Sequence, residues 1–468
     1  MFKRIWQSMP LRVLMISVGG FLVLYLGMTI YFTNHYFFQT TINGVKVSGK
    51  TVAQAEQMLQ DEIQSYILTL RGRNDVTTTI AAKDISLTYV KNDGLQQILQ
   101  DQMALFWIAS LFDKDTREVT DCTNFDADAL QKKVLHSPFF SKNNKKPKNA
   151  YVTYMEHQGY YVVNEERGAR VKKEALLQAT NDAVTALQET LYLDAADCYQ
   201  QPKYTADSSE IQALYAKVQR LTQAKIVYQF GKKTEVVDGD VIKDWITLNR
   251  KKATGKLDQA KIHKYVSALA SKYNTKGGKR IFQSSTGHKV AVSGGDYGWV
   301  LDTEKETKVL TKLICKGKEK TKQPAYIQKA TCFGKHDWGN TYVEVNLSKQ
   351  HLWYYKKGKL VIQSDFVSGN VRKHTVTPQG TYAVIYLERN AILGARSNAS
   401  YRTPVDYWMP FNGGIGLHDA KWRSRFGGNI YLTNGSHGCI NLPHAVAGKI
   451  FENMQRGTPV ICYYDIPV

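Results

Sequence analysis

The stretch Ser436-His437-Gly438-Cys439-Ile440-Asn441 carries the most information about this chain, and His418 lies 21 residues before its cysteine. A cysteine attacks as a thiolate, and a nearby imidazole can take the thiol proton. Gly435 and Gly438 allow backbone conformations that present consecutive N–H groups, as an oxyanion hole requires. The sequence therefore predicts an acyl-transfer site. The alternative is a packed, inert thiol, because free cysteine is among the most buried residue types.

Each polar residue of this region has an expected role. Cys439 is the expected nucleophile and His418 its general base, with the tetrahedral oxyanion held by backbone N–H groups around His437 to Cys439. His437 is two residues from the cysteine and receives a secondary role in orienting the loop or the substrate. Asp419 steadies His418 through its carboxylate or its backbone carbonyl, or else it is a solvated loop acid. Asn441 is a candidate hydrogen-bonding partner.

The surrounding pattern predicts that this stretch is a loop. It follows a strand-like run, Ile430 to Leu432, and precedes a helix that is expected to begin near Pro443. A loop between regular elements can hold a reactive side chain on a rigid scaffold.

A zinc site is the competing interpretation of the same region. The four residues that contain ligand types accepted by zinc are His418, His437, Cys439 and His444. Neither the CxxC nor the HxxxH spacing that is common in metal sites occurs among them. We therefore predict no metal and no cofactor.

A histidine, a spacer of 17 residues and then SHGCIN resembles the signature of L,D-transpeptidase catalytic domains. Two upstream runs, Thr377–Tyr382 and Asn346–Leu352, resemble early strands of that domain, so the resemblance extends over about 342–464. It implies that Cys439 is the nucleophile and His418 its base. It also implies that Ser436, His437 and Gly438 form the supporting loop. Many members carry an arginine where this chain has Asn441.

The resemblance also implies a substrate and a product. The acyl donor would be a peptidoglycan stem tetrapeptide, cleaved between its third residue, a diamino acid, and the terminal D-alanine. The acceptor would be the side-chain amine of another stem's third residue, which gives a 3→3 cross-link, and carbapenems would acylate Cys439. Water as acceptor would instead make the site a carboxypeptidase. A wall-binding anchor without activity is the alternative from another class, and the intact His418 and Cys439 favour the enzyme.

The N-terminal region predicts where this chemistry takes place. Val13 to Phe32 is a run of 20 residues without a charge, which is long enough to cross the hydrocarbon core of a bilayer. Lys3, Arg4 and Arg12 precede the run, so the positive-inside rule places the N-terminus in the cytoplasm and the remaining chain outside. A cleaved signal peptide is the alternative, but its apolar core is shorter and ends in an A-x-A-like site. We expect a single-pass signal anchor in the cell membrane.

A faint internal repeat lies between this anchor and the catalytic domain. Ile67–Leu70 corresponds to Ile226–Phe230, and the helix-like stretch Lys172–Leu187 corresponds to Glu304–Cys315. Chance similarity between ordinary strand–turn–helix units is the alternative. The two copies resemble the tandem peptidoglycan-binding modules that often precede L,D-transpeptidase domains.

The predicted fold is a multidomain α+β chain with an N-terminal transmembrane helix, two α+β modules and a C-terminal, mainly β catalytic domain. We expect a cytoplasmic tail over 1–12, the anchor over 13–32, the two modules over 33–204 and 205–335, and the catalytic domain over 336–468.

Composition limits the partners of this chain. The 62 basic and 41 acidic residues give a net charge of +21, which in an extracytoplasmic protein favours anionic wall polymers rather than nucleic acid. No glycine-rich phosphate loop or RNA-stacking signature supports a nucleic-acid function. The expected partners are peptidoglycan stem peptides, anionic wall polymers and the membrane, and the oligomeric state stays open.

Five cysteines remain when Cys439 is set aside for catalysis. Shared segments suggest two disulfides, Cys122 with Cys198 and Cys315 with Cys332, although spacing never fixes connectivity. The alternative is that all five, including the remaining Cys462, are reduced core residues.

Overall fold

The computed structural model describes residues 9–394 and 402–466. Residues 1–8 of the expected cytoplasmic tail, with Lys3 and Arg4, lie outside this part. The first described element is helix α2 (Met9–Phe32), and within Arg12–Phe32 an 18-residue window with a mean hydropathy of 2.2 contains no buried residue. By length and composition, this helix can cross a membrane.

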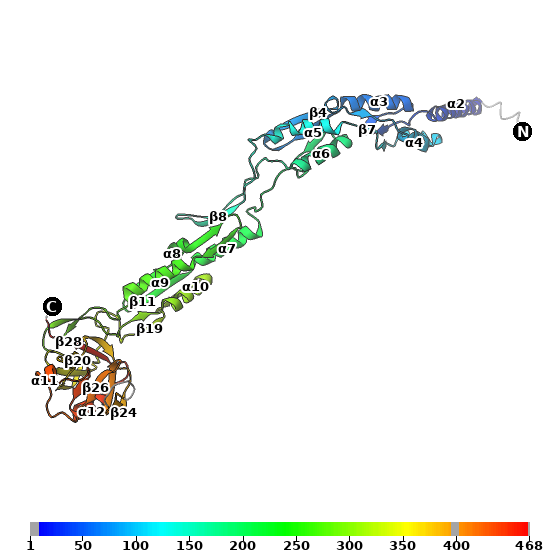
Figure 1. The fold of residues 1–468 in the computed structure, drawn as a ribbon. Helices are drawn as coiled ribbons and strands as arrows, with labels where there is room; N and C mark the ends of the chain where they lie inside the picture. Colours follow the sequence, from blue (N-terminus) through cyan, green and yellow to red (C-terminus); the bar gives the residue numbers. More distant parts are fainter. Residues whose placement is uncertain (1–8, 395–401, 467–468) are drawn as a thin grey trace. The chain divides into compact units, whose positions relative to one another are not determined.

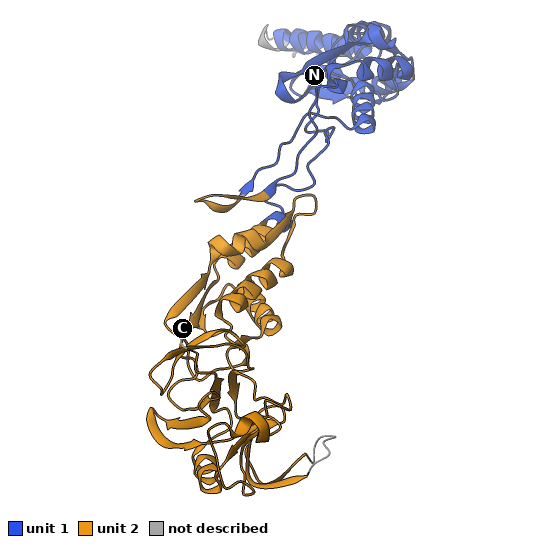
Figure 2. Cartoon of the chain, turned by 60° about the vertical axis from the view of Figure 1, so that its left-hand side comes forward, with its two compact units in different colours: residues 1–151, 162–211 blue, residues 152–161, 212–468 orange. Residues whose placement is uncertain are grey.

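The chain divides into two compact units, coloured separately in Figure 2. The first contains residues 1–151 and 162–211, and the second contains residues 152–161 and 212–468. The hairpin of β8 (Tyr151–Met155) and β9 (Gly159–Val163) contains the positions where the chain passes from the first unit to the second and back.

The described part of the first unit contains two three-stranded sheets, a two-stranded sheet and helices. Its helices are α3 (Val52–Ser65), α4 (Gly94–Asp101), α5 (Ala127–Leu135) and α6 (Lys173–Thr185). Its strands are β1 (Thr40–Ile42), β2 (Val45–Lys46), β3 (Ile67–Arg71), β4 (Thr77–Ala81), β5 (Thr88–Tyr89), β6 (Asp115–Arg117), β7 (Thr123–Asn124) and β10 (Thr190–Tyr192). In one of the three-stranded sheets, the central strand β3 pairs antiparallel with β4 and parallel with β10. Leu68 and Leu70, on one face of β3, are fully buried in the core of this unit.

The same strand order recurs in the first part of the second unit. Its helices are α7 (Ser209–Thr222), α8 (Gly239–Ile242), α9 (Gln259–Tyr273) and α10 (Thr303–Cys315), and its strands are β11 (Lys225–Phe230), β12 (Lys233–Val237), β13 (Ile246–Asn249), β14 (Thr254–Leu257), β17 (Val300–Leu301), β18 (Glu319–Lys322) and β19 (Tyr326–Gln328). Strand β11 pairs antiparallel with β12 and parallel with β18, and α9 and α10 lie side by side (Figure 1). Both sheets therefore have a hairpin partner and a parallel strand that returns after a helix, as an internal repeat requires.

Side-chain caps start the helices α5, α9 and α10. Asp126 before α5 and Asp258 before α9 each accept two backbone N–H groups of the first turn with one carboxylate oxygen. Asp302 caps α10 by accepting one backbone N–H, that of Lys305. The expected helices 172–187 and 304–315 correspond to α6 and α10.

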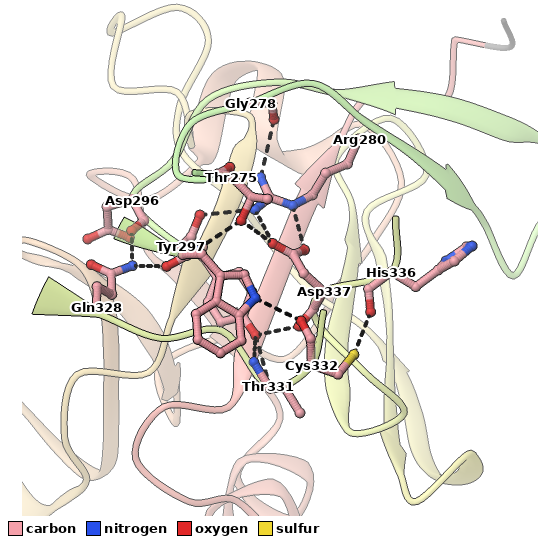
Figure 3. A network of polar contacts seen from close by, with 12 residues as sticks. Thr275, Gly278, Arg280, Asp296, Tyr297, Gln328, Thr331, Cys332, His336 and Asp337 are labelled. Atoms are coloured by element: carbon pink, nitrogen blue, oxygen red, sulfur yellow. Dashed lines mark hydrogen bonds and ion pairs between the residues drawn. The ribbon is translucent and has the colours of Figure 1, made fainter. Parts of the chain in front are cut away.

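A buried ion pair joins a hairpin in the middle of the chain to Asp337, just before the C-terminal sheets (Figure 3). Arg280, on the hairpin of β15 (Arg280–Gln283) and β16 (Lys289–Val292), donates from Nε and a terminal nitrogen to the two carboxylate oxygens of Asp337, at 2.9 and 2.8 Å. Thr275 donates to the same carboxylate at 2.6 Å. The hairpin also packs on Ile461 and Tyr463 of the C-terminal domain. The junction is therefore a packed interface with satisfied charges.

The C-terminal domain packs two sheets against each other. The five-stranded sheet has the order β22 (Lys359–Asp365), β21 (His351–Lys356), β20 (Tyr342–Asn346), β28 (Pro459–Tyr463) and β23 (Gly380–Ala383). The four-stranded sheet has the order β24 (Glu388–Leu393), β25 (Thr403–Asn412), β26 (Ile415–Asp419) and β27 (Ile440–Leu442). Side chains from both sheets and from α12 (His444–Asn453) form one apolar core. Burial alternates along β21, whereas β20, β26, β27 and β28 are buried at nearly every position, as strands covered on both faces are.

One local prediction is wrong. The strand-like run 430–432 is the start of a short helix, α11 (Ile430–Asn434). None of its residues is buried, so no sheet core selects an extended conformation there. The carbonyls of Tyr431 and Leu432 instead accept the backbone N–H groups of Val371 and Arg372.

The suggested disulfides are not formed, since all six cysteines are free. The alternative, that the five cysteines outside the site are reduced core residues, holds for three of them. Cys122, Cys198 and Cys462 are buried, whereas Cys315 and Cys332 are exposed.

Candidate active site

His418 and Cys439 lie on neighbouring parallel strands of the four-stranded sheet. His418 on β26 is level with Asn441 on β27, and Cys439 directly precedes β27. Successive side chains of a strand point to opposite faces. Leu417 and Ile440 point into the core between the two sheets, so His418, Cys439 and Asn441 share the other face. The structure therefore brings the predicted base and nucleophile to one side of one sheet.

The imidazole of His418 has a defined tautomer. Its Nδ1 lies 2.8 Å from the backbone carbonyl oxygen of Asp419, which can only accept, so Nδ1 carries the proton and Nε2 has the free lone pair. The side chain is buried, with the rings of Trp408 and Trp422 each 5.9 Å away. Burial lowers the pKa of His418 to about 4. The ring is therefore neutral at physiological pH and able to accept a proton at Nε2.

The thiol of Cys439 is covered and protonated. Its side chain is 8% exposed and packs against Ala391, Val405 and Trp408. The Sγ donates to the carbonyl oxygen of Gly414 at 3.6 Å. Burial raises the pKa of the thiol to about 11. The resting site therefore holds a neutral thiol and a neutral imidazole rather than an ion pair.

Asp419 is a buried structural acid and acts on His418 through its main chain. One carboxylate oxygen accepts the backbone N–H groups of Asp406 and Tyr407, at 2.8 and 2.9 Å. The residue is 1% exposed, so the alternative of a solvated loop acid is wrong. Of the two routes open from the sequence, the structure has the backbone carbonyl, which fixes the tautomer of the ring.

The loop that carries Cys439 is held by its own serine. Ser436 Oγ donates to the carbonyl oxygen of Cys439 at 2.6 Å and accepts the N–H of Gly438 at 3.0 Å. The second of these bonds uses the N–H of Gly438, which the sequence had suggested as an oxyanion-hole donor. The N–H of Cys439 is therefore a better candidate donor than that of Gly438.

Sequence reasoning missed a second segment that supports this loop. Thr377 Oγ1 donates to the carbonyl oxygen of Gly438 at 2.6 Å, and Thr375 Oγ1 donates to that of Ser436 at 2.9 Å. The backbone N–H of Asn370 also donates to the carbonyl oxygen of Ser436, at 3.0 Å. Thr377 opens the run Thr377–Tyr382 that we singled out as strand-like, but its hydroxyl contact crosses 61 residues of sequence.

The remaining predicted residues occupy different environments. His437 is exposed, whereas Asn441 is buried. The backbone of Asn441 forms two hydrogen bonds with Val367, and its side-chain oxygen has no partner within the described ranges. Asn441 is level with His418 across the strands and therefore stays a candidate orienting residue.

The four residues weighed for zinc do not form one cluster in the described part of the chain. His444, at the start of α12, lies 2.8 Å from Asp406, and the described group whose ligand atoms come together is Asp406, Asp419 and His444. Lys421 forms an ion pair with Asp406, which already compensates that carboxylate. Nothing in this arrangement assigns a cofactor.

Gly438→Ala is expected to lower kcat by about 10- to 100-fold, because it would move the nucleophile. Gly438 has a φ of +118°, and an added Cβ would lie 3.0 Å from a side-chain carbon of Ile415. Turnover of a stem peptide would be measured beside Gly428→Ala, since Gly428 also has a positive φ, +56°, but no heavy atom within 4 Å of the added Cβ. Equal kcat for the two variants would contradict this role of Gly438.

Two protein families match parts of this chain. The family of L,D-transpeptidase catalytic domains matches residues 340–462. A peptidoglycan-binding domain family matches residues 204–322. The search of curated proteins found no match.

Three solved structures illustrate the similarity. A crystal structure of a cysteine-to-serine mutant of the Enterococcus faecium L,D-transpeptidase is 35% identical, covers 53% of this chain and 98% of that chain, and has a TM-score of 0.46. The carbamoyl enzyme formed by Ldtfm and avibactam is 35% identical, covers 55% and 100%, and has a TM-score of 0.47. The catalytic domain of the E. faecium enzyme, solved by NMR, is 43% identical over 26% and 97%, with a TM-score of 0.24. With 35% identity over almost the whole of such a relative, this chain belongs to the L,D-transpeptidase family and has a peptidoglycan-acting catalytic domain preceded by a peptidoglycan-binding domain.

Proposed function

We propose that this chain is a membrane-anchored L,D-transpeptidase that forms 3→3 cross-links in peptidoglycan through a thioester on Cys439. The observation that supports it best is the neutral imidazole of His418, with its lone pair on Nε2, on the same sheet face as the thiol. A base in this tautomer and a thiol just before the adjacent strand are the two groups that covalent acyl transfer needs.

The proposed reaction has two halves. In the first, Nε2 of His418 takes the proton of Cys439, and Sγ attacks the carbonyl carbon that links the third stem residue to D-alanine. The N–H of Cys439 stabilises the oxyanion. When the tetrahedral intermediate collapses, the C–N bond breaks, the imidazolium gives its proton to the leaving amine, and D-alanine departs from a thioester.

The second half reverses the roles. The side-chain amine of another stem attacks the thioester carbonyl while His418 accepts a proton from that amine. The C–S bond then breaks, an amide forms, and the proton returns to sulfur. Cys439 is only 8% exposed, and exclusion of water favours the amine over hydrolysis. A carboxypeptidase would use the same residues with water as acceptor.

The pH dependence of this mechanism follows from the neutral pair. The base must be unprotonated, and the pKa of His418 is lowered to about 4, so activity is lost only as pH falls through that value. We expect kcat/KM to be level between about pH 5 and pH 7. A stopped assay of D-alanine release across this range measures it. An acid limb with its midpoint near the ordinary histidine value of 6.5 would contradict a buried neutral base.

We also propose the arrangement of the chain along the wall. The segment 1–12 would be cytoplasmic, 13–32 would span the membrane, and 33–204 and 205–335 would be two peptidoglycan-binding modules ahead of the catalytic domain at 336–468. The apolar helix α2 supports the anchor, and the repeated strand order of β3 and β11 supports the two modules. The net charge of +21 suits anionic wall polymers.

Product analysis tests the enzymatic proposal. The full chain, reconstituted in vesicles, would be incubated with disaccharide-tetrapeptide, and its products identified by mass spectrometry. We expect loss of D-alanine and dimers linked 3→3. Tripeptide without dimers would identify a carboxypeptidase, and no loss of D-alanine would contradict both activities. A carbapenem is expected to add its mass to Cys439, and an unshifted intact mass would count against the reactive thiol.

A further inference from the structure

Residues 103–112, here called the apolar loop, form an uncharged surface beside helix α2. The sequence of the loop, MALFWIASLF, contains no charged residue and is followed by Asp113 and Lys114. Its five large exposed apolar side chains, with the exposed fraction of each, are Met103 (65%), Leu105 (56%), Phe106 (60%), Leu111 (43%) and Phe112 (83%). Side chains of this size rarely gather on a water-facing surface without a partner.

The two ends of the loop are tied to the residues at the end of α2. Gln102 Nε2 donates to the carbonyl oxygens of Phe32 and His35, at 2.7 and 2.6 Å, and its Oε1 accepts the N–H of Phe37 at 3.1 Å. Gln39 Nε2 donates to the carbonyl oxygen of Leu111 at 2.7 Å. The loop therefore both begins and ends close to the C-terminal end of α2.

The middle of the loop extends back along the helix. Tyr25 Oη donates to the carbonyl oxygen of Leu105 at 2.6 Å, and the ring of Trp107 lies 6.1 Å from that of Tyr25 and 6.0 Å from that of Phe32. Tyr25 precedes Phe32 by seven residues, which is about 10 Å along a helix axis. The loop therefore reaches about 10 Å below the end of α2, into the zone that the helix itself would place in lipid.

Several backbone N–H groups of the loop are hydrogen-bonded within the loop. Two 3-10 turns, η3 (Ala104–Phe106) and η4 (Ala109–Leu111), make internal bonds from the N–H groups of Phe106, Ser110 and Leu111. Ser110 Oγ donates to the carbonyl oxygen of Trp107 at 2.6 Å. Non-helical backbone at membrane depth must have its polar groups satisfied within the protein and be covered by it. Helix α2 covers the middle of the loop, where Tyr25 donates to the carbonyl oxygen of Leu105 and Trp107 packs against Tyr25 and Phe32.

We propose that the apolar loop inserts into the outer leaflet of the lipid bilayer beside α2 and forms a second, re-entrant membrane contact. This inference rests on the proposed membrane anchor. Lipid is favoured as the occupant because the surface is continuous with the exposed apolar face of a helix that can span a membrane, and because its depth along that helix is fixed by Tyr25 and Gln102. Two membrane contacts would restrain the tilt of the first unit at the bilayer surface.

Photolabelling from within the bilayer tests the proposal. The full chain would be reconstituted in phosphatidylcholine–phosphatidylglycerol vesicles that contain a phospholipid with a diazirine in its acyl chain, irradiated, and mapped by mass spectrometry. We expect lipid adducts on both 12–32 and 103–112. The peptide containing Ile327, which is 72% exposed in the second unit, is the matched apolar control and should stay at background.

Variants separate the two proposals. Phe106→Ser combined with Phe112→Ser should reduce adducts on 103–112 to the level of the Ile327 peptide while labelling of 12–32 is retained. Adducts on 12–32 with only background on the wild-type loop would overturn the inference and leave the anchor standing. Absence of adducts from both segments would overturn the anchor as well. Cross-links from the loop to a second copy of the chain, without lipid adducts, would identify the loop as a protein interface instead and also overturn the inference.

Discussion

Cys439→Ala is expected to reduce D-alanine release from a stem tetrapeptide by roughly 10⁴-fold or more, because it removes the atom that forms the thioester. Binding and the backbone donors would remain, so a small residual rate is expected. The assay is single-turnover release of D-alanine, followed by mass spectrometry of the intact protein. The wild-type chain should show an acyl adduct that the variant lacks.

Cys462→Ala is the matched control for this experiment. Cys462 is also a buried free cysteine whose thiol pKa is raised by burial, but it lies on β28 in the core between the sheets. Its loss should cost stability and leave the chemistry intact. If Cys439→Ala turned over substrate at the wild-type rate, Cys439 would have no part in the reaction.

Asp337→Ala is expected to lower the free energy of unfolding of the second unit by about 3–5 kcal/mol. The substitution leaves the guanidinium of Arg280 buried, with its side chain only 5% exposed, and without its carboxylate partner. It also removes the acceptor of Thr275. Hydrogen exchange of peptides over 275–301 and 326–340 measures the change at the junction itself, where global unfolding of a multidomain chain is not two-state.

Asp240→Ala provides the contrast with a surface charge. Asp240 is 3.7 Å from Lys243 in the same unit, and its side chain is 86% exposed. Exposed pairs contribute about 0–1 kcal/mol, so exchange should scarcely change. Equal changes in hydrogen exchange for the two substitutions would show that the buried Arg280–Asp337 pair stabilises the fold no more than an exposed pair does.

The sequence predicted the parts of the fold that depend on local signals. The predicted fold class is confirmed, with an apolar N-terminal helix, mixed modules and a β-rich catalytic domain. Helix α10 could be predicted because Asp302 caps it and its apolar residues repeat at helical spacing. The run 430–432 could not, because its β-branched and aromatic residues favour a strand while its exposed position and its contacts with 371–372 favour a turn of helix.

The site divides in the same way. The pairing of Cys439 with His418 could be proposed from residue types and from a resemblance, whereas their common sheet face depends on the parallel register of β26 and β27. The hydroxyl of Thr377 reaches the carbonyl oxygen of Gly438 only because the chain folds these segments together. A contact across 61 residues cannot be predicted from local sequence spacing. The burial that sets both pKa values is likewise a property of the packed domain.

A covered, protonated thiol is also slow to oxidise. Peroxides and disulfides react with thiolates, and at neutral pH very little of a group with a pKa of about 11 is ionised. Most redox-sensitive cysteines are open and acidic, and Cys439 is neither. In a compartment without a glutathione pool, this thiol would keep its reduced form between turnovers without a dedicated reductant, and its ionisation would await the arrival of substrate.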